Sequence, residues 1–196
     1  MITVQLQLIT EMLGTVPKDD DIYRSYVESK RPDTGEDEVD IQTIEEKGWT
    51  GFHSDAEGLF IFEYMIKGFL KHWGNVLKES LKLKAVKSKI DNLVFISPRK
   101  IRFLSSVGNT ITEPHGTLSR PLRAYTPQGY IVAIAKSDYV NADSIIAFNI
   151  EIIDNGKKEI TPDIVKTLLE KGVYSGFGQF RNGGFGRFRI VEFEEK

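Results

Sequence analysis

The part of the sequence that says most about the fold is GVYSGFGQFRNGGFGRFRIVEF, residues 172–193. Six of the chain's 17 glycines lie from position 172 to position 186, interleaved with phenylalanines and arginines. Upstream, Thr161–Pro162–Asp163 supplies a capping hydroxyl, a proline suited to the first helical turn and an acid that complements the helix dipole. Lys171–Gly172 is a typical helix end, and the final residues alternate as a strand does. The chain therefore closes with a helix, a glycine-rich loop and a strand.

The remaining elements follow from hydrophobic periodicity. Residues 2–9 alternate apolar and polar side chains, which is typical of a half-buried strand. Residues 56–73 place apolar side chains at helical spacing, and residues 76–91 extend this helix or form a second, basic one. The other expected strands are a pair over 93–104 that is broken at Ser97–Pro98, and single strands over 130–136 and 144–153.

This order predicts an α+β fold with a ferredoxin-like (RRM-like) β-α-β-β-α-β core, in a single domain over residues 1–196. Residues 14–47 are expected to form a long acidic insertion in that core, and residues 172–187 its C-terminal Gly-rich loop. A generic α+β domain is the alternative.

Composition narrows the chemistry. The chain has 196 residues, a formal net charge of −2 and no cysteine. The missing cysteines exclude disulfides, thiolate nucleophiles, zinc ribbons and iron–sulfur clusters. No apolar run approaches about 18 residues, and the N-terminus lacks a basic region, so we expect no membrane span, no secretory signal and a cytoplasmic location, which is the host cytoplasm if a phage encodes the protein.

The small net charge hides a strong asymmetry along the chain. Residues 1–63 carry a net charge of −10, residues 64–137 carry +10, and residues 138–196 carry −2. A basic middle third is typical of a surface that binds polyanions. Internal neutralisation between the acidic and basic parts is an equally good interpretation of the charges alone.

The Gly-rich loop combines three groups that suit nucleic acid. Glycine lets backbone amides approach a phosphate, arginine offers bidentate phosphate contacts, and an exposed phenylalanine can stack on an unpaired base. This mixture favours single-stranded nucleic acid over a mononucleotide pocket. For the phenylalanines themselves, a place in the core is the favoured interpretation. The predicted nucleic-acid-binding residues are Lys67, Lys71, Arg99, Arg120, Arg123, Gly176, Gly178, Arg181, Gly183, Gly184, Arg187 and Arg189.

A dinucleotide-binding loop is not expected here. Gly176-x-Gly178 lacks a third glycine three residues later, and the segment follows a helix and precedes a strand, which is the reverse of that fingerprint. No other motif points to a cofactor.

The sequence also resembles a known superfamily. A helix, a glycine, GFGQFRNGGFGRF (176–188) and a final strand resemble the C-terminal Gly-rich loop of the RAMP superfamily, the ferredoxin-like RNA-binding proteins of CRISPR systems. HSDAEG (53–58), followed by a helix that bears Lys67-Gly68, is similar to the loop before the first helix of its backbone-forming branch. RPLRA (120–124), followed by a strand, looks like uncharacterised phage-encoded relatives.

The resemblance implies a subunit that polymerises along one RNA or DNA strand and reads its phosphate backbone rather than its sequence. It implies homo-oligomers or filaments, or assembly with CRISPR-type subunits. The opposite charges of residues 1–63 and 64–137 also favour head-to-tail contacts between copies.

Catalytic patterns are weak. His115, in a Pro- and Gly-rich loop beside arginines, could act as a general base on a ribose 2′-hydroxyl, and His53 is a second candidate. A structural histidine is the favoured interpretation of both. No metal-ligand motif is present; the acids of the insertion could hold a hard cation, but a solvated or docking loop is favoured. These acids are Asp19, Asp20, Asp21, Asp33, Asp37 and Asp40.

Three functions therefore stay open. The first is non-enzymatic binding of single-stranded nucleic acid, as a CRISPR-backbone-like subunit or a mimic of one. The second is a metal-independent endoribonuclease that uses a loop histidine. The third is a protein-only assembly or inhibitor module.

Overall fold

A computed structural model of the chain describes residues 1–18, 49–126, 129–157 and 159–195. It is a mixed α+β structure. In these residues, seven strands form one sheet in the order β12-β1-β11-β8-β6-β5, with β7 paired to β11. Their bounds are β12 Phe188–Glu195, β1 Ile2–Leu8, β11 Ile145–Ile152, β8 Lys100–Leu104, β6 Gly58–Phe62, β5 His53–Asp55 and β7 Val94–Ser97.

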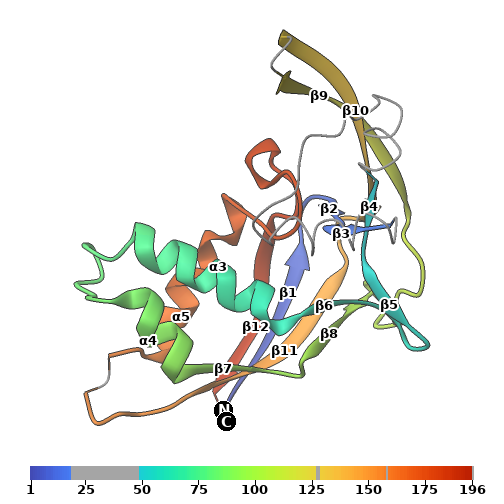
Figure 1. Cartoon of the computed structure of the whole chain (residues 1–196). Coiled ribbons are helices and arrows are strands. Elements are labelled where there is room, and N and C mark those ends of the chain that lie inside the picture. The colour runs from blue at the N-terminus through green and yellow to red at the C-terminus, as the bar shows by residue number, and fades with distance from the viewer. Residues whose placement is uncertain (19–48, 127–128, 158, 196) are drawn as a thin grey trace, which may run out of the picture.

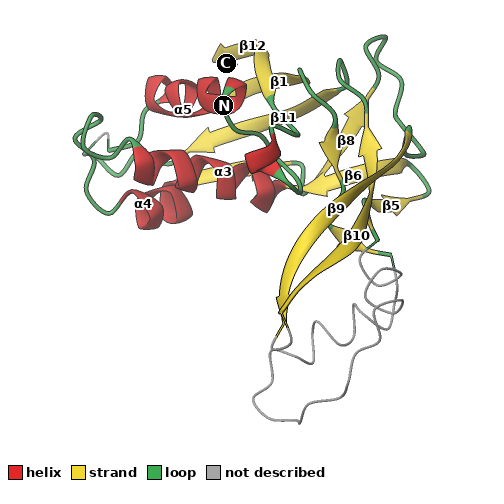
Figure 2. Cartoon of the chain, turned by 90° about the horizontal axis from the view of Figure 1, so that it is seen from above, coloured by secondary structure: helices red, strands yellow, loops and turns green. Residues whose placement is uncertain are grey.

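A second sheet contains a long hairpin. Within the described residues it has five strands in the order β2-β10-β4-β3, with β9 paired to β10. Strands β9 and β10 pair antiparallel from Gly116 opposite Tyr139 to Thr126 opposite Gly129, and they extend away from the body of the molecule (Figure 2). The bounds are β2 Met12–Leu13, β10 Gly129–Val140, β4 Thr50–Gly51, β3 Val16–Pro17 and β9 Gly116–Thr126.

The helices lie together on one side of the seven-stranded sheet (Figure 1). They are α3 Glu63–Val76, α4 Val86–Leu93 and α5 Pro162–Leu169, followed by the short 3-10 helices η1 Glu170–Val173 and η2 Arg181–Gly183. Thr161 caps α5 as expected, because its hydroxyl accepts a hydrogen bond from the Ile164 N–H at 3.3 Å. The basic segment after α3 forms a second helix and does not extend the first, because α4 is separate from α3.

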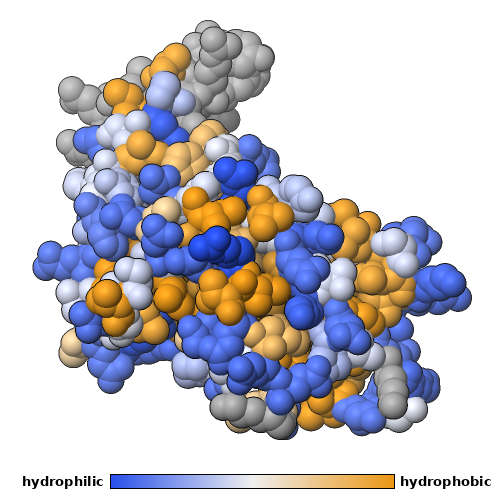
Figure 3. Space-filling view, turned by 180° about the vertical axis from the view of Figure 1, so that it is seen from behind, coloured by the Kyte–Doolittle hydropathy of each residue, from blue (hydrophilic) through white to orange (hydrophobic). Residues whose placement is uncertain are grey.

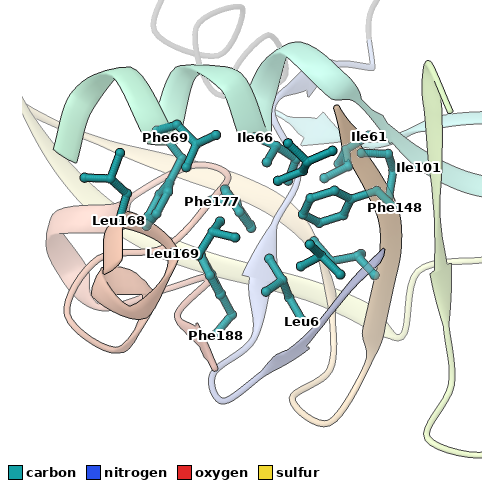
Figure 4. Close-up of a cluster of buried hydrophobic side chains, with 14 of the residues drawn as sticks. Leu6, Ile61, Ile66, Phe69, Ile101, Phe148, Leu168, Leu169, Phe177 and Phe188 are labelled. Atoms are coloured by element: carbon teal, nitrogen blue, oxygen red, sulfur yellow. The ribbon is translucent and has the colours of Figure 1, made fainter. Parts of the chain in front are cut away.

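The core forms between these helices and the sheet. Strand β1 buries every second side chain, from Ile2 to Leu8, so the predicted alternation is confirmed. Figure 4 shows Phe69 of α3, Leu168 of α5 and Phe148 of β11 among the packed apolar side chains. On the rear face of the molecule, apolar side chains lie in several patches that hydrophilic residues separate (Figure 3).

Two element predictions are wrong. Residues 56–73 are not one helix, because Gly58–Phe62 is strand β6, hydrogen-bonded to β5 on one side and to β8 on the other. An apolar run that is buried on both faces suits a central strand, and the helical spacing of Leu59 and Phe62 was coincidental. The loop expected around His115 is also shorter, since β9 begins at Gly116. Pro121 is tolerated in β9, which pairs only with β10 among the described strands.

Candidate nucleic-acid interface

The Gly-rich loop is held by backbone hydrogen bonds to the segment that follows β1. The Gly186 N–H donates to the Glu11 carbonyl at 2.7 Å, and the Gln179 N–H donates to the Leu13 carbonyl at 3.2 Å. The Ile9 N–H donates to the Arg187 carbonyl at 2.8 Å. The loop is therefore an ordered part of the fold, and its conformation is set from within the chain.

Two glycines of this loop serve backbone packing. A Cβ atom at Gly176 would lie 1.8 Å from the Gly186 carbonyl oxygen. At Gly178, where φ is +80°, a Cβ would lie 2.4 Å from the Leu13 carbonyl oxygen. No larger residue fits at either position, so internal packing accounts for both glycines without a bound phosphate.

The phenylalanines of the loop divide into two groups. Phe177 and Phe188 are buried in the core, which confirms the favoured interpretation for these two. Phe180 is 44% exposed, but the guanidinium of Arg120 lies over its ring at 5.0 Å and Phe185 packs beside it. The loop therefore presents few free aromatic faces to a ligand.

Arg181 lies where the Gly-rich loop meets α3. Together with Met65, Gly68, Phe69 and His72, it lines a cavity of about 340 Å³. A second cavity of about 370 Å³ continues from the same glycine and histidine toward α4, where it is lined by Lys71, Asn75, Lys87 and Asp91. We call this continuous feature the α3 groove; it is defined by Gly68, Lys71, His72, Lys87 and Arg181.

The position of α3 explains why this groove exists. The helix lies between α4 on one side and the Gly-rich loop on the other (Figure 1). Gly68 opens the middle of the groove, because a Cβ atom built there would meet nothing within 4 Å. A glycine in a helix interior destabilises the protein relative to alanine. Because there is room for a side chain at Gly68, packing within the fold does not require this glycine.

The charge of the groove is positive. Lys71 forms an ion pair with Asp91 at 2.9 Å, and Lys67 donates to the Asp91 backbone carbonyl at 2.9 Å. Lys87 and Arg181 form no ion pair with any acid among the described residues. Of the residues predicted from the sequence, Lys71 and Arg181 line the groove, whereas Lys67 shares the partner Asp91 but does not line it. His72 and Lys87 were not predicted, although His72 follows Gly68 by one helical turn.

Arg120 does not lie on this surface. Its side chain is only 9% exposed and reaches from β9 to Ser137 Oγ at 3.1 Å and to Gln179 Oε1 at 3.0 Å. Thr50 Oγ1 also donates to that Gln179 oxygen at 2.9 Å. Burial lowers the pKa of the Arg120 guanidinium. The residue joins the base of the β9–β10 hairpin to the Gly-rich loop.

The other predicted arginines are dispersed. Arg187 precedes β12, and its Nε donates to the Gly184 carbonyl at 3.1 Å, which supports the turn of the loop. Arg189, on the exposed side of β12, donates from Nε to Gln7 Oε1 at 2.9 Å. Arg99 is exposed before β8, beside Phe62. The side chain of Arg123 lies outside the described residues. Gly183 and Gly184 form the turn around η2.

The two candidate catalytic histidines lie in separate places. His53 on β5 stacks on Phe60 with 5.5 Å between ring centroids, and burial lowers its pKa. His115 is exposed, and its Nδ1 accepts a hydrogen bond from the Asn141 N–H at 3.3 Å. Both environments fit structural histidines. The acids that could hold a cation, Asp19 to Asp40, lie outside the described residues.

Comparisons with known proteins address the fold. No family model matches the sequence, and no curated protein matches it. Among solved structures, a chain of a Type III-B Cmr-beta complex bound to cognate target RNA superposes with a TM-score of 0.51 at 11% identity, covering 98% of this chain. The protein shares that chain's fold. It spans 59% of that chain's length.

A chain of a Type IV-B CRISPR complex also superposes, with a TM-score of 0.48 at 11% identity over 100% of this chain and 90% of that one.

Within the residues that the structure describes, no helix is both long enough and apolar enough to cross a membrane.

Proposed function

We propose that the protein binds single-stranded nucleic acid, RNA in preference to DNA, with the strand's sugar–phosphate backbone in the α3 groove. The observation that carries the proposal is the convergence of Lys71, His72 and Arg181 on the open backbone at Gly68. An exposed glycine lets phosphates approach closely, and the cations Lys71 and Arg181 beside it give sequence-independent, salt-dependent affinity. The fold shared with a chain of an RNA-bound complex supports the same function.

We further propose that the core is ferredoxin-like and that copies of the chain assemble along one strand. The sheet order β12-β1-β11-β7, with α3 after β1 and α5 before β12, supports the first part. The opposite charges of residues 1–63 and 64–137 support head-to-tail contact between copies, which would give a filament if the contact does not close. CRISPR-type subunits are the proposed partners of such an assembly.

The experiment measures binding of a fluorescent single-stranded RNA by anisotropy, with the same RNA annealed to its complement for comparison. Protein purified without nuclease is first assayed for co-purified nucleic acid by its absorbance ratio at 260 and 280 nm. We expect the single strand to bind at low salt and more tightly than the duplex. If neither RNA binds at low salt, the proposed function is wrong.

A further inference from the structure

A second feature lies at the N-terminal end of α3, where four aromatic rings form a ladder. His53 and Phe60 stack with 5.5 Å between centroids, and the Phe60 and Phe62 rings meet edge to face at 5.2 Å. The Phe62 ring then stacks on Tyr64 at 5.5 Å, with 22° between the ring planes. We call these four residues the aromatic corner.

From Phe60 through Phe62 to Tyr64, the rings of the corner become more exposed. Phe60 is buried, His53 and Phe62 are half-buried, and Tyr64 is 58% exposed. Packing against the sheet explains the inner rings, because β6 needs cover on this face. The same argument does not explain the outermost ring, which leaves much of its surface to solvent.

Basic residues surround the corner, and one of them has no acidic partner among the described residues. Lys100 and Arg102 lie over the Phe60 ring at 4.8 and 5.1 Å, but Asp55 holds both in ion pairs at 2.7 and 2.6 Å. Arg99 lies over the Phe62 ring at 5.7 Å and forms no ion pair with a described acid. An unneutralised guanidinium thus sits beside exposed aromatic surface.

The exposed end of the corner lies one helical turn from the α3 groove. Tyr64 precedes Gly68 by four residues, so both lie on one face of α3 and are separated by about 6 Å along its axis. The groove crosses α3 from the Gly-rich loop toward α4, and a base that projects from a strand in it toward the N-terminal end of α3 would approach the exposed ring of Tyr64. Phe177 of the Gly-rich loop is buried, and Phe180, although 44% exposed, already has the Arg120 guanidinium over its ring and Phe185 beside it, so Tyr64 is the better placed ring.

We propose that the aromatic corner stacks an unpaired nucleobase on Tyr64 while Arg99 contacts a neighbouring phosphate. This inference rests on the proposed function, because it assigns the base of the same strand whose backbone occupies the α3 groove. Base–aromatic stacking tolerates any sequence and requires an unpaired base. The corner therefore gives the protein its preference for single strands.

The test separates stacking from phosphate binding. Two fluorescent strands of equal length are compared by anisotropy, an oligouridine RNA and a sugar–phosphate strand that lacks bases. The wild-type protein should bind the oligouridine about tenfold more tightly, since a stacked base adds to the affinity that the phosphates alone provide. Tyr64→Ala should bring the ratio close to one without changing affinity for the abasic strand, and Tyr64→Phe should keep the ratio.

Controls keep the outcomes distinct. Tyr174→Ala removes a ring that is 72% exposed on a different element, and it should leave the ratio unchanged. Thermal melting confirms that each variant is folded. Equal wild-type affinity for the two strands would overturn the stacking proposal while the proposed function stands. Failure to bind either strand would overturn both.

Discussion

The rings of Phe177 and Phe188 lie face to face, with 4.4 Å between their centroids and 8° between their planes. Phe69 of α3 packs against both, at 5.2 and 5.0 Å. One ring comes from the Gly-rich loop, one from β12 and one from the helix that forms the floor of the α3 groove (Figure 4). Hydrophobic packing therefore fixes the position of the loop, and of Arg181 within it, relative to α3.

Removing one ring of this stack should destabilise the whole protein. Phe177→Ala leaves a cavity between the loop and α3, so we expect the free energy of unfolding to fall by about 3–5 kcal/mol. Urea denaturation followed by circular dichroism measures it. The exposed Tyr174 is the control, since Tyr174→Ala should change stability by less than about 0.5 kcal/mol. A similarly small effect at Phe177 would contradict the packing described above.

The two glycines of α3 should respond oppositely to alanine. Gly68→Ala should stabilise the protein by about 0.5–1 kcal/mol, because the added Cβ meets nothing and alanine favours the helix. Gly74→Ala should destabilise it by about 1–3 kcal/mol, because the added Cβ would lie 2.5 Å from Val86 Cγ1. Thermal melting of both variants checks the prediction. If Gly68→Ala lowered the melting temperature as Gly74→Ala should, the space around Gly68 would not be open.

Arg120 should matter for stability rather than for direct contact with a ligand. Arg120→Ala removes the guanidinium that donates hydrogen bonds to Ser137 Oγ and Gln179 Oε1 in a buried network. We therefore expect the free energy of unfolding to fall by about 1–3 kcal/mol. Arg189→Ala is the matched control, because that arginine bonds to Gln7 in an exposed position. Urea denaturation of both variants tests the difference, and equal effects would argue against the buried network.

The His53 side chain should make stability depend on pH. Burial lowers its pKa in the folded protein below the ordinary 6.5, so the unfolded chain binds more protons just below that pH. Stability is therefore highest above pH 6.5 and is lost as the pH falls from 6.5 through the lower pKa that His53 has in the folded protein. His53→Phe keeps a ring against Phe60 and removes the titration. Urea midpoints measured from about pH 7.5 to 5.5 should fall less in this variant, and an identical fall would contradict the assignment.

Much of the fold could be predicted from local patterns that tertiary contacts reinforce. Alternation in residues 2–8 sets the buried face of β1, and Thr161 with Pro162 marks the start of α5. The hydrophobic pattern did not predict a strand at Gly58–Phe62, because a strand that is buried on both faces does not alternate apolar and polar residues. Only its pairing with β5 and β8 makes that segment a strand.

The candidate site was predictable in part. Charge and helical spacing predicted Lys67 and Lys71, and the Gly-rich loop predicted Arg181; of these three, Lys71 and Arg181 line the α3 groove. Sequence could not show that Arg120 would turn inward, because its partners Ser137 and Gln179 come from β10 and from the Gly-rich loop. The aromatic corner was missed for the same reason, since its rings come from β5, β6 and α3.

The salt dependence of RNA affinity tests the α3 groove most directly. For single strands, the logarithm of affinity falls with the logarithm of salt concentration by about 0.7 for each phosphate contact. Lys87→Ala combined with Arg181→Ala should therefore make this slope shallower by about 1.4 and weaken binding at low salt. Lys166→Ala combined with Lys171→Ala removes the same charge from α5 and η1 and should leave the slope unchanged. A slope that is the same in the groove variant as in the wild-type protein would contradict the account.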